Sequence, residues 1–189
     1  MRRKLAATGL IGVCLSFAAA CSAPQTDRAA TSSSGAPVYF SLENYFRSES
    51  ARLQQSAPVV TKVVIKNDDR ESRDIQIDNW QNELMLFVDS DINKPAWQHS
   101  FQTDSSATTT VYNSIDPKLR TKQIKIEKNV NGAITHIYIH NSDENMLYTS
   151  SEELDYFPDS LYRINKKQRV AIIGENTYTI TGTFTASTP

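Results

Sequence analysis

The feature that most restricts the fold of this chain is a hairpin centred on the dipeptide Asn131-Gly132. Asn-Gly is favoured where both central residues of a tight turn need positive φ angles. On either side, residues 122–128 and 133–141 alternate apolar with polar side chains, which is typical of strands with one buried face. A two-residue loop places Val130 opposite Ala133, and it sets the register of the whole hairpin.

This register predicts two faces of opposite character. On the face expected to be core, the pairs are Ile126 with Ile137 and Ile124 with Ile139. On the face expected to be solvated, the pairs are Glu127 with His136, Lys125 with Tyr138 and Gln123 with His140. A slip by a single residue exchanges the two faces, so the hydrophobic pattern specifies this pairing strongly.

Other segments that are rich in β-branched residues and bounded by turn residues predict further strands. They are 59–66, 73–77, 99–103, 108–113, 145–154, 160–165, 168–173 and 177–185. Apolar residues at helical spacing predict two helices, 41–55 and 78–88, with Ser41 and Asp78 as N-caps and Gln81 completing a capping box. The expected fold is α+β: a curved, half-barrel-like antiparallel sheet of about seven to nine strands with two helices packed on one face.

The N-terminus, MRRKLAATGLIGVCLSFAAAC, has the parts of a signal peptide. The basic residues at 2–4 favour retention of the N-terminal end on the cytoplasmic side of the membrane. The uncharged apolar run 6–20 is shorter than the ~20 residues that a spanning helix needs. The small residues before Cys21 resemble the lipobox of bacterial lipoproteins, although Ala18 stands where such boxes usually have Leu. The resemblance implies that residues 1–20 are removed and that Cys21 is lipidated. The alternatives are an ordinary secretory signal, with Cys21 incidental, and a cytosolic protein with an apolar N-terminus.

Residues 21–37 combine the lipidated cysteine with a flexible linker, because SAPQTDRAATSSSGAP has no large apolar side chain to bury. Residues 38–189 are long enough for a single domain with its own core. Ser22 is neutral, which among lipoproteins suits transfer to the outer membrane. Asp27 beside Arg28 does not make the acidic cluster of lipoproteins exported to the cell surface. We therefore expect an outer-membrane protein that faces the periplasm.

The net charge bears on the class of binding partner, and the number of cysteines bears on disulfide formation. The 169 residues after the signal carry 17 basic and 21 acidic side chains, a net charge of −4 without a basic block, so nucleic acid is not an expected partner. Cys14 is lost with the signal, which leaves Cys21 alone, and no intramolecular disulfide is expected.

Two patterns contain metal-binding side chains at suggestive spacing. His136 and His140 are four residues apart, but on a strand that spacing separates them by roughly 13 Å, so we expect no shared ion. Asp89-x-Asp91-x-Asn93 matches the first ligand positions of an EF-hand loop, but Lys94 stands where that loop needs Gly. The expected structure there is a turn with side-chain-to-backbone hydrogen bonds.

The sequence also contains clustered carboxylates, which could act as acids or bases, and aromatic residues, which could line a ligand-binding groove. Glu152, Glu153 and Asp155 form an acidic patch, which more often marks a surface strand than a glycosidase site. Four aromatic residues are expected to be core or cross-strand packing rather than the lining of a sugar or peptide groove: Tyr148, Tyr156, Phe157 and Tyr162. The sequence has no nucleophile elbow, H-E-x-x-H motif or phosphate-binding glycine loop. We therefore expect no catalytic, cofactor-binding or metal-ligating residue, and a single modified residue, Cys21.

Three segments resemble small lipoproteins of unknown function found in the Bacteroidota: the helix 45–53, SDINKPAW at 90–97 and SSEELDYFPDSLYRI at 150–164. The resemblance spans most of the chain after the linker. It implies a lipoprotein and brings no catalytic residues with it.

The expected function is that of a non-enzymatic, lipid-anchored binding or structural accessory of the cell envelope. Its expected partners are the membrane, through the lipid on Cys21, and an envelope protein. The first alternative is a lipid or lipoprotein carrier, which needs an apolar cavity between the sheet and Phe46, Trp80 and Phe87. The second is an envelope hydrolase, which needs His99 close to a serine and an acid.

Overall fold

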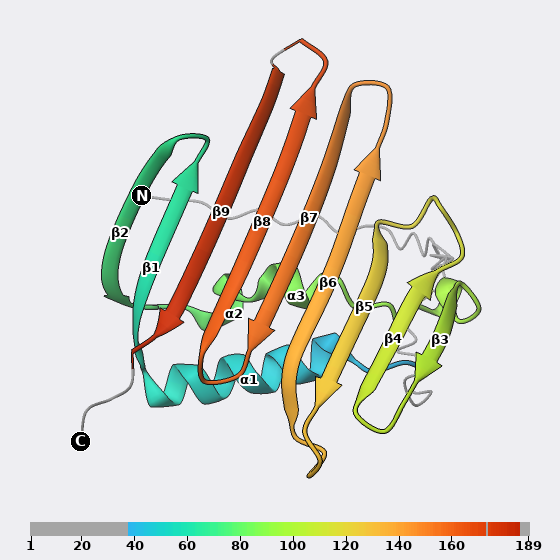
Figure 1. Cartoon of the computed structure of the whole chain (residues 1–189), viewed down its shortest axis with the longest axis horizontal. Helices are drawn as coiled ribbons and strands as arrows, with labels where there is room; N and C mark the ends of the chain where they lie inside the picture. The colour runs from blue at the N-terminus through green and yellow to red at the C-terminus, as the bar shows by residue number, and fades with distance from the viewer. Residues whose placement is uncertain (1–37, 173, 186–189) are drawn as a thin grey trace, which may run out of the picture. The chain divides into compact units, whose positions relative to one another are not determined.

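A computed structural model describes residues 38–172 and 174–185 of the chain (Figure 1). Within them, nine strands form one antiparallel sheet in the order β2-β1-β9-β8-β7-β6-β5-β4-β3. The strands are β1 (Val59–Lys66), β2 (Asp69–Gln76), β3 (Phe101–Ser105), β4 (Thr109–Ser114), β5 (Thr121–Lys128), β6 (Ile134–Glu144), β7 (Tyr148–Phe157), β8 (Leu161–Val170) and β9 (Gly174–Phe184). The predicted signal peptide 1–20, Cys21 and the linker lie outside the described residues.

The predicted antiparallel sheet is confirmed, and so is the register of its central hairpin. Ile124 pairs with Ile139 and Ile126 pairs with Ile137, and all four side chains are buried. The strands from β3 to β9 are consecutive antiparallel neighbours joined by short connections, whereas β9 pairs with β1 from the start of the chain's fold.

The turn of this hairpin is longer than predicted. The N–H of Gly132 donates to the carbonyl of Asn129 (2.9 Å), and the N–H of Asn129 donates to the carbonyl of Ala133 (2.9 Å). Gly132 has a φ of 81°, as the residue that closes such a loop requires. The predicted pairing of Val130 with Ala133 is therefore wrong. A register shift beyond Glu127 adds one residue to β6, and this bulge restores the predicted pairing farther along the strands.

The strand break predicted at Lys166-Lys167 is also wrong, because β8 runs through both lysines. Lys166 Nζ lies 2.9 Å from Glu152 on β7, and Lys167 Nζ lies 3.0 Å from Glu175 on β9. Pairing with acids on the two neighbouring strands keeps adjacent lysines within the sheet. The turn predicted at 174–176 is instead the start of β9.

Helix α1 (Leu42–Ser56) begins as predicted, with the Ser41 hydroxyl accepting a hydrogen bond from the N–H of Asn44 (3.1 Å). It ends at Ala57, whose φ of 44° is left-handed. Leu42, Phe46 and Leu53 are buried, which confirms the apolar stripe of this helix.

The second predicted helix is two short helices, α2 (Trp80–Glu83) and α3 (Met85–Val88), followed by the 3-10 turn η1 (Pro95–Trp97). Its N-cap is Asn79 rather than Asp78, because the Asn79 side chain accepts from the N–H of Asn82 (3.0 Å). The helix is interrupted at Leu84, where the N–H of Phe87 donates to a carbonyl only three residues back (3.1 Å). Leu84 and Phe87 remain fully buried across this break.

Figure 1 shows α1, α2 and α3 behind the sheet, and the core lies between them and the strands. Two buried tyrosines that face each other on β7 and β8 join these layers. Tyr156 donates its hydroxyl to Glu49 of α1 (2.5 Å), and Tyr162 donates to Glu83 of α2 (2.5 Å). Burial raises the pKa of both hydroxyls, and the neighbouring carboxylates raise it further. Each tyrosine therefore remains a hydrogen-bond donor.

Candidate functional site

The face of the sheet opposite the helices carries polar side chains in rows across the strands. Strand alternation places every second residue on this face, and the register aligns these residues from β5 to β9. One row consists of Gln123, His140, Glu153, Asn165 and Thr179, and the next of Lys125, Tyr138, Asp155, Arg163 and Thr181. We call this surface the polar face.

His136, on the polar face, contacts two carboxylates and one aromatic ring. Its Nδ1 lies 3.1 Å from Glu127 Oε2, and its Nε2 lies 2.8 Å from Asp155 Oδ1. The ring stacks on Phe157, with centroids 4.1 Å apart and planes within 1°. Each ring nitrogen of His136 therefore faces one carboxylate oxygen. With both nitrogens occupied, His136 is placed to join Glu127 and Asp155 rather than to accept a proton from a substrate.

Charges around this histidine are balanced by their neighbours. Lys125 Nζ lies 2.5 Å from Glu127 Oε1. The hydrogen bond from Lys125 holds the pKa of the Glu127 carboxyl below its usual range, against burial and with further help from His136. Burial raises the pKa of the Tyr138 hydroxyl, and the charges of Glu153 and Asp155 raise it further. The polar face therefore presents fixed hydrogen-bond donors and carboxylate acceptors.

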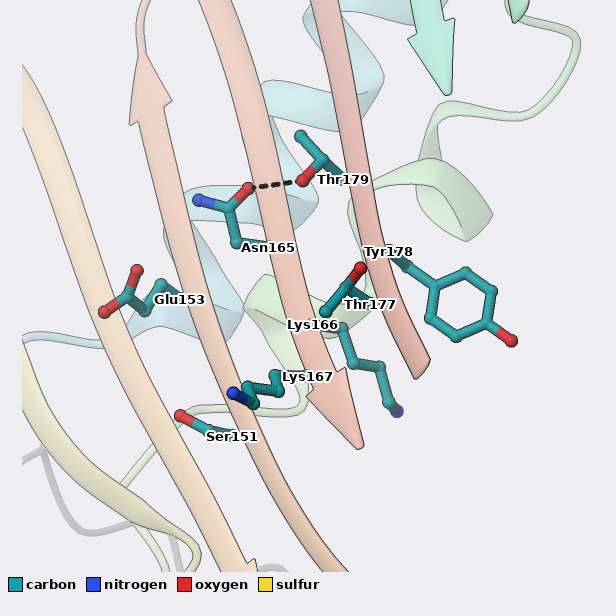
Figure 2. A pocket seen from close by; sticks show the side chains of 8 residues that line it. All are labelled: Ser151, Glu153, Asn165, Lys166, Lys167, Thr177, Tyr178 and Thr179. Carbon is teal, nitrogen blue, oxygen red and sulfur yellow. Dashed lines mark hydrogen bonds between the residues drawn. The ribbon is translucent and has the colours of Figure 1, made fainter. Parts of the chain in front are cut away.

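A hollow of about 280 Å³ lies where the polar face crosses β7, β8 and β9 (Figure 2). Figure 2 shows two rows of side chains, with Glu153, Asn165 and Thr179 above Ser151, Lys167 and Thr177. Lys166 and Tyr178, which also line the hollow, point away from these rows. The Thr179 hydroxyl donates to Asn165 Oδ1 (3.1 Å). The hydroxyl, amide, carboxylate and ammonium groups that line this hollow suit a polar ligand or the surface of another protein.

The nearest approach to a catalytic pair on this face is His140 and Ser151, whose Nε2 and Oγ atoms are 3.3 Å apart. An activated serine also needs a group that orients the histidine and donors for the developing oxyanion. Among the described residues no hydrogen bond to Nδ1 of His140 is present. His99, on which the hydrolase hypothesis depended, is exposed between η1 and β3.

A second polar cluster lies on the helix side of the sheet around Glu152, whose side chain is 7% exposed. It forms ion pairs with Arg120 and with Lys166 (2.9 Å). Burial alone raises the pKa of this carboxyl, but the hydrogen bond from Lys166 and the charge of Arg120 outweigh burial and hold the pKa below its ordinary value. Glu152 is therefore a buried anion and not a proton donor.

Asn141 connects this cluster to the helix layer. Its Nδ2 donates to the hydroxyl of Ser90 (2.9 Å), which in turn donates to the carbonyl of Leu86 (2.7 Å). Within the described part of the chain, Asn141 Oδ1 is buried and has no hydrogen-bond partner. The sequence did not identify the residues that contact Glu152. Arg120 and Asn141 belong to no motif that distinguishes them from other polar residues of the sequence.

The structure separates the predicted acidic patch. Glu152 points to the helix side, whereas Glu153 and Asp155 lie on the polar face, so the three do not form a carboxylate pair of the glycosidase kind. The predicted aromatic set is divided in the same way. Tyr156 and Tyr162 are core, Phe157 lies under His136, and Tyr148 is 38% exposed at the start of β7.

The segment that resembles an EF-hand loop holds the start of α1. Asp91 Oδ2 accepts hydrogen bonds from the N–H of Glu43 (2.8 Å) and the hydroxyl of Ser41 (3.2 Å). Asp91 Oδ1 accepts from the N–H of Asn93 (2.7 Å), so the predicted side-chain-to-backbone bonding is confirmed. Across residues 38–172 and 174–185, no three His, Cys, Asp or Glu side chains are grouped to hold a metal ion.

Comparison with models of known protein families, with curated proteins and with solved structures found no match. Among the helices of the described residues, none combines the length and the apolar character needed to cross a bilayer.

Proposed function

We propose that this chain is a non-enzymatic, lipid-anchored protein of the cell envelope that binds a partner through the polar face. It is held in the outer membrane by lipid on Cys21 and faces the periplasm. The sequence of residues 1–21 supports the anchor, and the resemblance to small lipoproteins of the Bacteroidota agrees with it. The observation that carries the binding role is the polar face itself. Its polar side chains are aligned and held by hydrogen bonds on the side of the sheet that the helices leave open.

The anchor is tested by replacing its single acceptor. Cys21→Ser is expected to release the domain as a soluble protein or to leave it uncleaved, because the thioether to lipid cannot form. Cys14→Ser is the matched control and should remain anchored, since that cysteine lies within the predicted signal. Flotation of membranes and metabolic labelling with a fatty acid measure both outcomes. A processed Cys21→Ser chain that still floats with outer membranes contradicts the anchor.

The binding role is tested on the hollow of the polar face. Glu153→Ala with Lys167→Ala removes one acid and one base there, and Glu43→Ala with Arg47→Ala removes an exposed acid and base from α1. We expect cross-linking in intact envelopes to recover a partner with the wild-type chain and the α1 variant but not with the first variant. Equal recovery with both variants contradicts binding through the polar face.

The alternative is a lipid or lipoprotein carrier, in which the sheet curves as a half-barrel around the helices and encloses an acyl chain. The rings of Phe46, Phe87 and Tyr156 lie in the space that this ligand needs, with centroids 4.7 Å apart for Phe46–Phe87 and 5.2 Å for Phe46–Tyr156. This packing favours the binding accessory. Stoichiometric uptake of a fluorescent fatty acid by the purified chain would instead support the carrier.

A further inference from the structure

Exposed apolar side chains are concentrated at one end of the sheet. Met146 is 97% exposed, Leu147 71%, Tyr148 38% and Ile172 95%. The first three lie at the turn between β6 and β7, and Ile172 lies at the turn between β8 and β9. The other large apolar side chains that are exposed in the described part of the chain lie away from these turns in the sequence: Val38, Val59, Met85, Ile115 and Val130.

The two turns form one surface. The N–H of Ala171 donates to the carbonyl of Leu147 (3.0 Å), which joins the β8–β9 turn to the β6–β7 turn. We call Met146, Leu147, Tyr148, Ala171 and Ile172 the apolar tip. Figure 1 shows both turns at the upper ends of β6 to β9, beyond the level of the helices. The apolar tip therefore lies at one end of the sheet, where Tyr148 also lines a hollow together with Lys122 and Asn145.

Hydrogen bonds hold the β6–β7 part of the tip in place. Asn145 Oδ1 accepts from the N–H of Leu147 (2.9 Å) and of Tyr148 (3.0 Å), and the N–H of Asn145 donates to the carbonyl of Tyr148 (2.9 Å). Met146 and Leu147 thus project from an ordered turn. Their contact with another surface requires little further ordering of the backbone.

Charged side chains follow directly below the apolar tip. Lys167 and Arg169 each lie 3.0 Å from Glu175, and Asp143 lies 3.5 Å from Arg120. Apolar side chains at the end of the sheet, with charged side chains next to them, suit the boundary between lipid acyl chains and headgroups. Exposed apolar patches mark contacts with proteins or with membranes, and the proposed lipid anchor places a membrane within reach.

We propose that the apolar tip inserts into the interface of a lipid bilayer. This inference rests on the proposed lipid anchor, which keeps the domain close to a membrane. The sixteen residues between Cys21 and Val38 span at most roughly 55 Å when extended. The ten residues of β8 span roughly 33 Å. The tether is therefore long enough for the tip to reach the bilayer that holds the anchor.

The test uses the full chain purified from envelopes and returned to vesicles of phosphatidylethanolamine and phosphatidylglycerol with a fraction of brominated lipid. A fluorophore is attached at Met146→Cys, and the matched control carries it at Val130→Cys. Val130 is 93% exposed, and Figure 1 places its turn, between β5 and β6, at the lower end of the sheet. We expect brominated lipid to quench the label at 146 and to leave the label at 130 unchanged.

Leu147→Asp with Ile172→Asp, placed in the Met146→Cys chain, should remove the quenching. Burying one Leu or Ile changes an equilibrium by roughly tenfold or more, so two replacements lower insertion by roughly 100-fold. These side chains are exposed, and an unchanged circular dichroism spectrum confirms that the variant is folded. Equal quenching at 146 and 130, or quenching that survives the aspartates, overturns the proposal. Absence of quenching at 146 in the chain without the aspartates also overturns it.

Failure of the anchor gives a different result. In a chain that has lost residues 1–20 and has no added cysteine, thiol label is taken up only if Cys21 carries no lipid, because Cys14 has been removed. Such labelling contradicts the proposed anchor, and quenching at 146 in vesicles mixed with that protein still reports on the tip. Absence of quenching in the same vesicles overturns the tip as well.

Discussion

Replacement of Glu152 by glutamine tests how much the buried ionic cluster stabilises the fold. The carboxylate accepts a hydrogen bond from Lys166 (2.9 Å) and pairs with Arg120, while its own side chain is 7% exposed. A hydrogen bond to a charged group stabilises by ~1.5–3 kcal/mol, and a neutral one by ~1 kcal/mol. The amide that replaces the carboxylate keeps one neutral acceptor.

The Glu152→Gln variant is therefore expected to lose about 2 kcal/mol of unfolding free energy. This is less than the ~3–5 kcal/mol for breaking a fully buried pair, because Arg120 and Lys166 are 28% and 36% exposed and regain water. Urea unfolding at neutral pH, followed by tryptophan fluorescence, measures the difference.

Glu175→Gln is the matched control. Glu175 also pairs with two cations, Lys167 and Arg169, both at 3.0 Å, but it lies at the exposed end of β9. Solvent screens such pairs, so its unfolding midpoint should be unchanged within error. Equal effects of the two substitutions would refute the reasoning, because burial is the property that distinguishes them.

The ionised Glu152 carboxylate should stabilise the fold to a degree that depends on pH. The pKa of Glu152 is lower in the folded chain than its ordinary value of 4.5. The stabilisation is therefore fully present well above pH 4.5 and is lost as the pH falls through the folded-state pKa. The difference between wild type and Glu152→Gln should narrow in this acidic range. A difference that stays constant into acid would show that charge is not its source.

Three further substitutions test the packing of the fold. Gly182→Ala should destabilise by ~2 kcal/mol or more in thermal unfolding, because its Cβ would lie 2.2 Å from the ring of Tyr162; an unchanged midpoint refutes the close contact. Asp91→Ala should lower the unfolding free energy by ~1–2 kcal/mol, since the N–H of Glu43 loses its acceptor; faster amide exchange at the start of α1 checks the location. Tyr162→Phe removes the hydroxyl bound to Glu83 and should lose ~1.5–3 kcal/mol in urea unfolding; no loss would mean that water replaces the bond.

The parts of the fold that follow from short-range patterns could be predicted. The alternation of Ile124 and Ile126 with Ile137 and Ile139 determined the register, since a shift by one residue exposes all four. Ser41 was identified as an N-cap because its hydroxyl satisfies an N–H three residues later. The strand break predicted at 166–167 was wrong because more distant residues decide there. The two lysines of β8 stay in the sheet because acids on neighbouring strands pair with them.

Less of the candidate site than of the fold could be predicted from the sequence, because the residues of the site come from several strands. The cross-strand pair of His136 with Glu127 was predicted from the hairpin, but the second carboxylate, Asp155, comes from the next strand. The polar character of His140 and Glu153 is visible in the sequence, whereas the hollow beside Glu153 needs β8 and β9 aligned with β7.

The sequence by itself determined most of the local elements, and residues 1–28 are the basis of the predicted location, because signal, turn and periodicity are read over a few neighbouring residues. Only the tertiary structure decided which charges are buried and which apolar residues stay exposed. Glu152 becomes a buried anion because Arg120, 32 residues away, folds against it. Leu147 and Ile172 remain exposed because their turns lie beyond the helices that cover the core. Burial depends on contacts between distant segments, and no local pattern records it.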